Sequence, residues 1–404
     1  MASLGLPKAG RPKHVGLSAK RLARLSETLR QDVERDMIPG AVVLIARGGH
    51  IAYAEAFGWR DREAEAPMEL DAIFRIASMT KPLTSVAAMI LAEEGKLQIA
   101  APVAEYLPEL ADRTVGAERA PANRTMTVQD LLRHTSGLTY ATFGDSAVQM
   151  IWRDAQLMTE DQTNAELVTK LASLPLMFEP GTTWEYSMST DVLGRVVEVV
   201  SGRDLADFID TRICRPLELR DTGFAATGER AARLAEPQTD AATGQRPPMR
   251  DPTRPGRWAS GGGGAVSTAA DYARFCQMLL NGGELDGTRL LAPKTVALMA
   301  SDHLPPGCSY GDTARPRFGA LAPIPEMGYG FGLGFAVRTD AGRCPLPGSL
   351  GEYFWGGVLG TSFWIDPVEQ LVVVAMMTAP ERRLYYRHLL RPLVYGAVIG
   401  PPPS

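Results

Sequence analysis

Cysteine is scarce in this sequence: four thiols stand among 404 residues, at Cys214, Cys276, Cys308 and Cys344. No two of them have the spacing of metal ligands, and four scattered cysteines in a chain of this length do not form a disulfide framework. We therefore exclude a zinc-stabilised fold and a disulfide scaffold, and we expect a reduced, intracellular protein.

Long apolar runs and a strong charge of one sign are also missing. No stretch of about 18 apolar residues occurs, so we expect no transmembrane helix. The first 20 residues contain no apolar signal-peptide core, which favours a cytoplasmic location. The net charge is -4, with 42 basic and 46 acidic residues mixed along the chain, so we expect neither a nucleic-acid nor a membrane partner.

The length predicts two lobes. A chain of 404 residues exceeds what one hydrophobic core usually serves, and the composition, 45% hydrophobic and 22% charged, is that of a globular protein. After an N-terminal arm at 1–17, we assign residues 18–110 and 226–404 to an α/β lobe, and residues 111–225 to a mainly helical lobe inserted into it. The segment 225–258, rich in Pro, Gly, Arg and Ala, is expected to be irregular.

The order of the elements predicts the fold class. Short sequential strands joined by turns imply an antiparallel sheet, and helices at both termini would cover its faces. We therefore predict an α+β fold with a ligand site in the cleft between the lobes. Strands are expected at 41–46 and 51–57, as a hairpin, and at 328–337, 356–364 and 371–377. Helices are expected at about 18–37, 78–94, 191–200, 268–280 and 384–398, with further helix starts at Thr127 and Asn164.

One stretch, Phe74 to Lys81, organises this scheme. It predicts a helix start with Ser78 and Lys81 on one face, because positions i and i+3 lie about 5–6 Å apart at Cβ. A serine hydroxyl becomes a nucleophile only when a neighbour takes its proton, and a lysine does so only when its pKa is lowered. The apolar run that follows Lys81 predicts burial. A capping serine beside a surface lysine is the alternative.

Two other segments carry groups that would complete such a site. Tyr186 is a candidate general base if a lysine ammonium stabilises its phenolate or shares its proton; a packed core tyrosine is the alternative. The Trp355-Gly356-Gly357 run precedes a predicted strand, and glycines there allow close backbone approach. The N–H groups of Ser78 and Val358 are the candidate oxyanion donors, whereas a sheet-edge bulge is the alternative for the glycines.

Two further signals are set aside. The Gly-Cys-Ser-Tyr-Gly run at 307–311 matches a nucleophile elbow, but prolines precede it and a loop follows it, where a strand and a helix are required. His134, which precedes a Thr-Ser-Gly-Leu segment, is interpreted as structural rather than as the base of a catalytic triad.

Taken together, the motifs resemble those of a known superfamily. Ser-x-x-Lys at 78–81, Tyr-Ser-x at 186–188 and Trp-Gly-Gly at 355–357 occur in the order and spacing of the class C type serine β-lactamases and penicillin-binding proteins. The Trp-Gly-Gly version is similar to that of the family VIII carboxylesterases. The resemblance spans about residues 18–398, and the Asp130 to Leu138 run supports it.

The resemblance implies a β-lactamase-like fold and a serine carboxylesterase that needs no cofactor or metal. Ser78 would attack the ester, Lys81 and Tyr186 would take its proton, and a small-molecule ester would be the partner. Aromatic and apolar residues near the motifs indicate a confined pocket for short acyl groups. The candidate substrate-binding residues are Met79, Tyr140, Phe143, Met188, Tyr353, Trp355, Gly356 and Gly357.

Two departures from the β-lactam-processing members bear on the substrate. Those members carry an asparagine where this chain has Met188, which cannot bond a substrate amide. They also carry a lysine where this chain has Trp355, so a cation that attracts the carboxylate of the drug is missing. A neutral ester is therefore expected. β-Lactamase or D-amino-acid peptidase activity, acyl transfer, and a non-catalytic binding role stay open as alternatives.

A proline close to the predicted helix start creates a conflict with local rules. Pro82 follows Lys81 directly, and a residue before proline is disfavoured in the α region. We therefore expect the helix to be locally distorted near Ser78, or the carbonyl of Ser78 to bond elsewhere.

Overall fold

The computed structural model describes residues 4–238, 245–246 and 249–402. Within these residues an antiparallel sheet has the strand order β12-β13-β14-β15-β16-β1-β2-β3. The strands are β1 Gly40–Arg47, β2 His50–Asp61, β3 Ala66–Pro67, β12 Tyr329–Phe331, β13 Ala336–Arg338, β14 Tyr353–Gly356, β15 Ser362–Asp366 and β16 Leu371–Met377.

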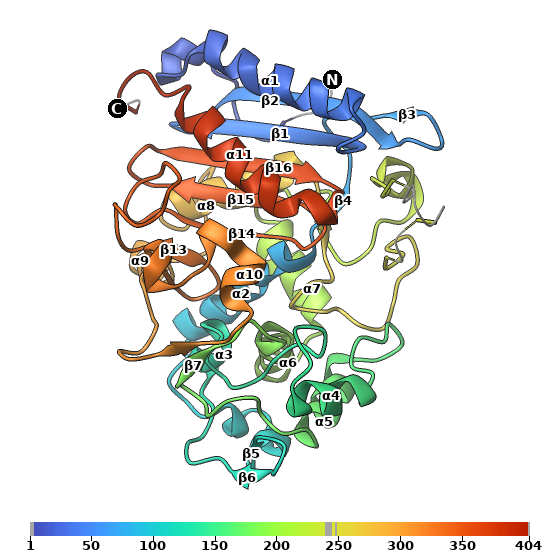
Figure 1. Ribbon diagram of the computed structural model, residues 1–404, viewed down its shortest axis with the longest axis vertical. Coiled ribbons are helices and arrows are strands. Elements are labelled where there is room, and N and C mark those ends of the chain that lie inside the picture. Colours follow the sequence, from blue (N-terminus) through green and yellow to red (C-terminus); the bar gives the residue numbers. More distant parts are fainter. Residues whose placement is uncertain (1–3, 239–244, 247–248, 403–404) are drawn as a thin grey trace.

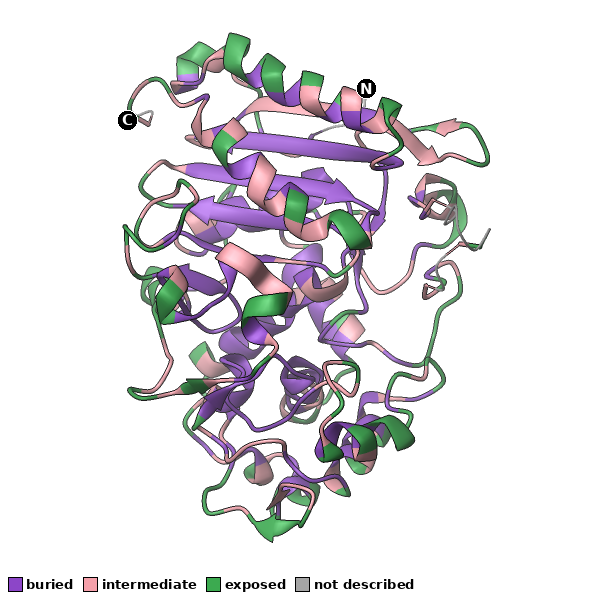
Figure 2. Cartoon of the chain, viewed as in Figure 1, coloured by how far each residue is buried: buried purple, intermediate pink, exposed green. Residues whose placement is uncertain are grey.

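The centre of the sheet is buried on both faces. Strands β1 and β16 are nearly continuous apolar runs and every residue in them is buried. Helices α1 (Ala19–Glu34) and α11 (Arg383–Tyr395) lie across one face, and α8 (Ala269–Leu280) packs on the other (Figure 1). In Figure 2 the strands are mostly buried, whereas the outward faces of α1 and α11 are exposed. The α+β fold class is therefore confirmed.

The remaining helices lie mostly beyond the sheet, where α2 packs against α6 (Figure 1). These helices are α2 Thr80–Glu93, α3 Val128–Leu132, α4 Ala147–Asp154, α5 Asn164–Ala172, α6 Ser189–Ser201, α7 Leu205–Ile209, α9 Pro293–Met299 and α10 Ala314–Phe318. Short strand pairs connect distant segments: β4 Phe74–Arg75 with β8 Val266–Ser267, β5 Thr114–Val115 with β6 Ala120–Pro121, β7 Thr183–Trp184 with β11 Ser309–Tyr310, and β9 Glu284–Leu285 with β10 Thr288–Arg289. The predicted division into two lobes stays a prediction.

Most predicted elements are found, and their capping residues explain why. Ser18 caps α1, Thr127 and Thr163 form capping boxes at α3 and α5, and Thr268 caps α8. Gly202 ends α6 in the left-handed conformation, as expected of a C-cap glycine. The hairpin of β1 and β2 and the strand at 371–377 are confirmed.

Two predicted strands are wrong because glycines break them. The segment 328–337 contains two strands, β12 and β13, joined by a turn in which Gly334 has a φ of 110°. The segment 356–364 spans the turn between β14 and β15, where Gly360 has a φ of 121°. Both φ angles lie in a region that side chains other than glycine avoid.

Two predicted irregular segments hold more structure than expected. The arm at 4–17 includes a 3-10 turn, η1 (Pro12–Val15), and its Leu6 and Leu17 are buried. The segment 225–258 begins with another 3-10 turn, η6 (Gly228–Arg233), whereas its residues 239–244 and 247–248 lie outside the described residues.

A buried ion cluster ties α11 to the sheet. The carboxylate of Glu352, which is fully buried, accepts hydrogen bonds from Arg338 of β13 at 3.0 Å and from Arg391 of α11 at 2.7 Å. Tyr329 and Tyr395 donate to the same carboxylate at 2.8 and 2.9 Å. Because both guanidiniums are also buried, this carboxylate is their shared counterion.

Replacing Glu352 tests this cluster. Glu352→Gln leaves two buried guanidiniums without a counterion, so we expect the free energy of unfolding to fall by about 3–5 kcal/mol, measured from urea unfolding. Glu284→Gln, which breaks the exposed pair with Arg289, is the matched control and should cost about 1 kcal/mol or less. Equal losses of unfolding free energy in the two variants would show that the buried cluster contributes no more to stability than an exposed ion pair.

Candidate active site

Ser78 lies on a strained turn between β4 and α2. It is the middle residue of a 3-10 turn, η2 (Ala77–Met79), and Ala77 has a φ of 44°, which is uncommon for a residue with a side chain. Thr80 stabilises the turn, because its hydroxyl donates to the Ala77 carbonyl at 2.7 Å and accepts from the Ala265 N–H at 3.0 Å. Strain of this kind often marks functional positions.

The start of α2 removes the conflict posed by Pro82. The sequence predicted a helix from about Ser78, but α2 begins at Thr80, and Pro82 is the third helical residue. The N–H groups of the first turn have no partner within the helix, so a proline there removes no helical bond. The expected local distortion is confirmed as the 3-10 turn that carries Ser78.

Lys81 is buried behind Ser78. Its ammonium donates to the phenol oxygen of Tyr140 at 3.1 Å and to the carbonyl of Gly262 at 2.8 Å, and it lies 4.5 Å from the ring centroid of Tyr186. The structure therefore brings the predicted lysine and tyrosine together and adds a second phenol, that of Tyr140.

The pKa of Lys81 differs from the sequence expectation. Burial alone would lower the pKa of the ammonium, but Tyr140, Tyr186 and Asp191 beside it outweigh burial and raise that pKa above its ordinary value. The predicted burial of Lys81 is therefore confirmed, but the groups around it favour the charged ammonium over a neutral amine base. Burial also raises the pKa of Tyr140, although the charge of Lys81 opposes this.

Tyr186 is fixed by the aromatic residues around it. The indole N–H of Trp355 donates to its phenol oxygen at 3.2 Å, and the ring packs against those of Trp355 and His134 at centroid distances of 5.1 and 4.8 Å. Burial and the charge of Lys81 hold the pKa of His134 well below its ordinary value, so the imidazole is neutral. Its Nδ1 accepts from the Ser187 N–H at 3.3 Å. These contacts agree with a structural role for His134.

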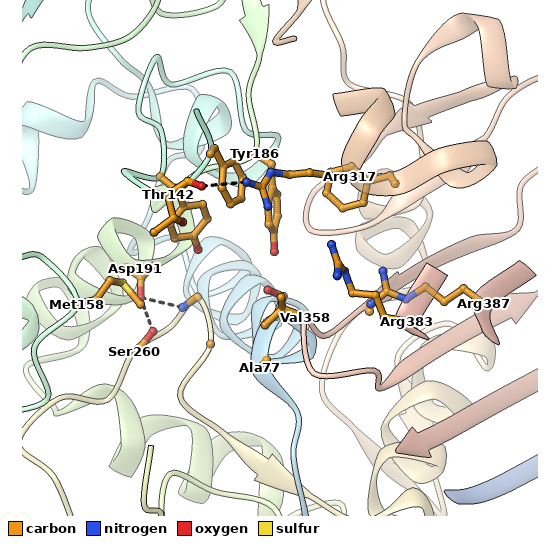
Figure 3. A pocket seen from close by; sticks show the side chains of 17 residues that line it. Ala77, Thr142, Met158, Tyr186, Asp191, Ser260, Arg317, Val358, Arg383 and Arg387 are labelled. Carbon is orange, nitrogen blue, oxygen red and sulfur yellow. Dashed lines mark hydrogen bonds between the residues drawn. The ribbon is translucent and has the colours of Figure 1, made fainter. Parts of the chain in front are cut away.

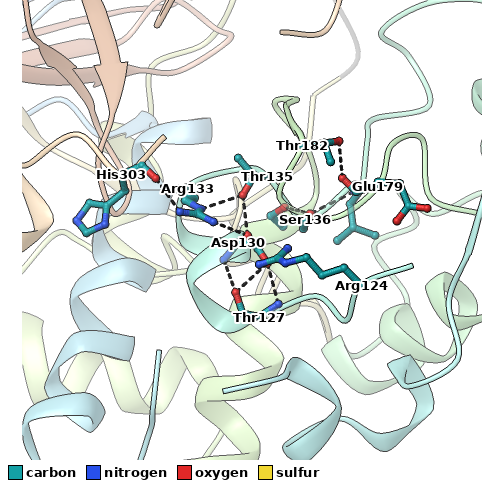
Figure 4. Close-up of polar contacts among 11 residues, drawn as sticks. Arg124, Thr127, Asp130, Arg133, Thr135, Ser136, Glu179, Thr182 and His303 are labelled. Atoms are coloured by element: carbon teal, nitrogen blue, oxygen red, sulfur yellow. Dashed lines mark hydrogen bonds and ion pairs between the residues drawn. The ribbon is translucent and has the colours of Figure 1, made fainter. Parts of the chain in front are cut away.

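A buried carboxylate positions the loop that carries His134 and Tyr140. Asp130 accepts hydrogen bonds from Thr127, Arg133 and Thr135 at 2.8–2.9 Å, and from Arg124 at 2.8 Å (Figure 4). These bonds hold the start of the segment that leads to Tyr140, in agreement with a structural role for the Asp130 to Leu138 run.

The candidate oxyanion donors, the N–H groups of Ser78 and Val358, lie on two segments whose backbones are in close contact. A Cβ on Gly357 would lie 2.5 Å from the Ile76 carbonyl oxygen and 2.4 Å from the Thr361 hydroxyl, so only glycine fits there. The close approach is thus made by the protein itself, not by a ligand. Within the described chain, the N–H groups of Ser78 and Val358 have no hydrogen-bond partner, so both are available to a ligand oxygen.

A cavity of about 300 Å³ opens beside Ser78 (Figure 3). It is lined from both predicted lobes: Tyr140 and Tyr186 come from the helical lobe, and Ser78 and Val358 from the other. Of the residues predicted from the sequence, the lining includes Ser78, Tyr140, Phe143, Tyr186, Gly356 and Val358.

Five predicted substrate-binding residues do not line this cavity. Met79 and Met188 are buried in the core around the starts of α2 and α6. Tyr353 is buried beside Phe335. Trp355 lies behind Tyr186, to which it donates, and Gly357 is covered by Ile76 and Thr361. Met79, Met188, Tyr353, Trp355 and Gly357 are thus absent from the lining of this cavity, and direct substrate contact by them stays a prediction. Proximity in sequence to a motif did not reveal which way each side chain points.

The structure also adds lining residues that sequence reasoning missed. On one side of the cavity, the carboxylate of Asp191 accepts from the Ser260 hydroxyl at 2.5 Å and from the Gly262 N–H at 3.1 Å (Figure 3). Burial raises the pKa of Asp191, although the charge of Lys81 opposes this. A Cβ on Gly262 would lie 2.3 Å from this carboxylate, so the glycine-dense segment in the sequence was the available signal.

The opposite side of the cavity is lined by Arg317 of α10 and by Arg383 and Arg387 of α11 (Figure 3). No local pattern in the sequence marked these residues, because an arginine in a short helix or at a helix start is usually a surface residue.

No helix among the described residues is long and apolar enough to cross a membrane. Across the same residues, no group of three or more His, Cys, Asp or Glu side chains is arranged to hold a metal ion.

Glu185, next to Tyr186, makes stability depend on pH. Burial raises the pKa of its carboxyl from 4.5 to about 7, so the folded state binds a proton that the unfolded state releases between these two values. The stability contributed by the protonated form is therefore present near pH 4.5 and is lost as the pH rises to 7.

We expect the wild-type chain to lose about 2–4 kcal/mol of unfolding free energy across this interval relative to Glu185→Gln, since glutamine mimics the protonated acid. Urea unfolding of both proteins from pH 4.5 to 8 measures the difference. Parallel stability profiles for the two proteins would contradict the raised pKa of Glu185.

Comparisons with known proteins agree with this geometry. A statistical model of the family described as Beta-lactamase matches residues 25–391. Protein Rv1367c of Mycobacterium tuberculosis is 36% identical over 363 residues, which cover 87% of this chain and 88% of that protein. Esterase EstB of Burkholderia gladioli is 34% identical over 384 residues, which cover 89% of this chain and 91% of that protein.

Among solved structures, EstCE1, described as a hydrolase with promiscuous acyltransferase activity, superposes with a TM-score of 0.77 at 30% identity. The match covers 94% of this chain and 99% of that chain. The family model covers most of the sequence, and both esterases match over nearly their whole length. The chain therefore belongs to the beta-lactamase family, as a family VIII carboxylesterase of the serine β-lactamase and penicillin-binding-protein superfamily.

Proposed function

We propose that this protein is a serine carboxylesterase that hydrolyses short-chain acyl esters through an acyl-enzyme. The observation that carries the proposal is the shared cavity of Ser78 and Tyr186, with the ammonium of Lys81 buried directly behind it. A nucleophile, a candidate base and a fixed positive charge therefore surround one space large enough for a small ester.

In the proposed first step, Tyr186 is a phenolate: the Ser78 hydroxyl attacks the ester carbonyl and gives its proton to the phenolate oxygen, which leaves Tyr186 as a neutral phenol. The raised pKa of Lys81 favours this assignment, because a charged ammonium stabilises a phenolate but does not itself accept a proton. The indole N–H of Trp355, which bonds the same oxygen, adds to this stabilisation. The N–H groups of Ser78 and Val358 would then bind the oxyanion.

In the proposed second step, Tyr186 returns the proton to the alcohol as it leaves, and the acyl group stays on Ser78. Water then attacks the acyl-enzyme with the same general base, and the acid is released. Tyr140 is the competing candidate, because its phenol oxygen also accepts a hydrogen bond from Lys81, but burial raises its pKa and so disfavours its phenolate.

The size of the cavity favours small acyl groups. A volume of about 300 Å³ lies at the lower limit of small-molecule sites. The phenyl ring of Phe143 and the phenol of Tyr140, 4.9 Å apart at their centroids, narrow it further. This supports the preference for short acyl chains that the sequence predicted. A cytoplasmic location likewise remains a proposal.

Acyl transfer is the second candidate function. EstCE1, which matches nearly all of this chain, is described as a hydrolase with promiscuous acyltransferase activity, and an acyl-enzyme open to water is also open to an alcohol. β-Lactamase or peptidase activity is less well supported, because Met188 and Trp355 replace the polar residues that β-lactam-processing members use.

Substitutions in the cavity test the assignment of the base. Ser78→Ala should lower kcat for p-nitrophenyl acetate by at least about 1000-fold, and Tyr186→Phe by roughly 100- to 10,000-fold. Tyr140→Phe is the matched control: it removes the other phenol oxygen that faces Lys81 and should cost much less. A larger loss of kcat in Tyr140→Phe than in Tyr186→Phe would assign the base role to Tyr140. Full activity of Ser78→Ala would contradict the proposed function.

A series of substrates tests the reaction and its size limit. Across p-nitrophenyl esters from acetate to decanoate, we expect kcat/KM to fall beyond short acyl chains, because the cavity holds about 300 Å³. Adding an acceptor alcohol and measuring the transesterified product separates acyl transfer from hydrolysis. Rates that rise steadily to long chains, or faster turnover of nitrocefin than of p-nitrophenyl acetate, would contradict this assignment.

A further inference from the structure

Three arginine side chains form one wall of the cavity beside Ser78. Arg317 comes from α10, and Arg383 and Arg387 come from the first turns of α11 (Figure 3). We call these three residues the arginine wall. It faces the side of the cavity on which Asp191, Met158 and Ser260 lie (Figure 3).

The arginine wall has no carboxylate partner. In the part of the chain that the structure describes, none of the three guanidiniums makes an ion pair, although many other arginines do. Arg317 donates to the Thr142 carbonyl at 3.1 Å, Arg383 to that of Pro380 at 2.9 Å, and Arg387 to that of Gly357 at 2.6 Å. Each guanidinium has five N–H donors, so most of them stay unused. The Nε atoms of Arg317 and Arg387 are buried without a partner.

Mutual repulsion makes this arrangement unfavourable in the free protein. Burial, and then the charge of Arg383, lower the pKa of Arg387 to about 10, and the same two causes lower the pKa of Arg317. The carboxyl whose charge acts on Arg317 is that of Glu185, and burial raises the pKa of Glu185 to about 7. The carboxylate of Asp191 is already bonded to Ser260 and Gly262. An anion bound at the wall would relieve this repulsion.

The fold makes room for one of these side chains. A Cβ on Gly356 would lie 2.5–2.7 Å from the Nη2, Cζ and Nε atoms of Arg387. The guanidinium therefore occupies the space that any other residue at position 356 would fill. Alternation along β14 turns Phe354 and Gly356 toward α11, where Arg391 also packs over the Phe354 ring at 4.9 Å.

The arginine wall lies close to the reacting atoms. Arg387 donates to the Gly357 carbonyl, and this carbonyl belongs to the same peptide group as the N–H of Val358. That N–H is the proposed oxyanion donor, so the carbonyl of a bound ester and the Arg387 guanidinium would lie at opposite edges of one peptide group. Because the arginine wall, Ser78 and Val358 line one cavity of about 300 Å³, a negative group bound at the wall would be a few bonds from the ester carbonyl.

We propose that the arginine wall binds an anionic group on the substrate, so that the preferred substrates are short esters that carry a carboxylate or a phosphate a few bonds from the ester carbonyl. This inference rests on the proposed esterase function. It replaces the expectation of a neutral ester, which considered only the cation lost at Trp355 and not the positive charge that α10 and α11 bring to the same cavity. Arginine forks suit both oxyanions, since two parallel N–H groups match two oxygens.

Matched ester pairs test the proposal. Monophenyl glutarate and adipate, each with its carboxylate free or methylated, place the charge on the acyl side, and 4-acetoxybenzoate with its methyl ester places it on the alcohol side. We expect kcat/KM, corrected for the spontaneous reaction, to be about tenfold or more higher for the charged member on at least one side. The preference should shrink as salt is added. 4-Acetoxyphenyl phosphate, compared with 4-acetoxybenzoate, distinguishes phosphate from carboxylate recognition.

Variants of the wall connect any preference to these residues. Arg317→Gln and Arg383→Gln should each lower the ratio of charged to neutral kcat/KM by roughly tenfold. Arg382→Gln is the matched control, because Arg382 is an exposed neighbour at the start of α11 that does not line the cavity, and the ratio should not change. Arg387 is left intact, since it also bonds the Gly357 carbonyl.

The outcomes separate this inference from the esterase function. Equal rates for charged and neutral esters, or an unchanged ratio in both wall variants, would overturn the inference and leave the esterase function intact. If none of the esters is turned over, the proposed esterase function is wrong. In that case, binding of monophenyl adipate to the Ser78→Ala variant, measured by calorimetry, tests anion binding at the arginine wall by itself. Weaker binding when Arg383→Gln is added to the Ser78→Ala variant would support anion binding by the arginine wall, and absence of binding to Ser78→Ala would refute it.

Discussion

The buried ammonium of Lys81 is the constraint on which the site depends. A charge in the protein interior is tolerated only when it is paired or fully hydrogen-bonded, and here the Gly262 carbonyl and the Tyr140 phenol supply the bonds. The rest of the site is arranged around this requirement. The glycine-dense segment brings a bare backbone carbonyl to the lysine, Asp130 fixes the loop that carries Tyr140, and Tyr186 places its ring within 4.5 Å of the charge.

This arrangement also explains why three segments distant in sequence meet. Each brings a different kind of group: η2 the hydroxyl, the segment after β7 a phenol, and the turn after β14 an amide N–H. The β4–β8 pair and the contact of Gly357 with the Ile76 carbonyl bring the nucleophile turn against its neighbours. The relative positions of attack and of oxyanion binding therefore depend on backbone contacts, which are stiffer than contacts between flexible side chains.

Sequence reasoning located the fold class and the chemistry better than the substrate-binding surface. Periodicity and capping residues predicted α1, α8 and the β1–β2 hairpin, because those signals are local. Ser78, Lys81 and Tyr186 were found by motif, and the structure brings them together. By contrast, Met79 and Met188 were expected to face the substrate and are buried, since the direction of a side chain depends on tertiary packing. Asp191 and the arginines of α10 and α11 carried no local signal, because their significance arises only when separate elements converge on one cavity.

The stacking of Arg317 on Phe143 has a consequence for the shape of the cavity. The guanidinium lies 3.4 Å from the centroid of that ring and bonds the carbonyl of the preceding residue, Thr142. Because Arg317 and Phe143 both line the cavity, this side chain links α10 directly to the loop that carries Phe143. A shift of α10 would therefore carry Phe143 with it and alter the width of the cavity beside Ser78.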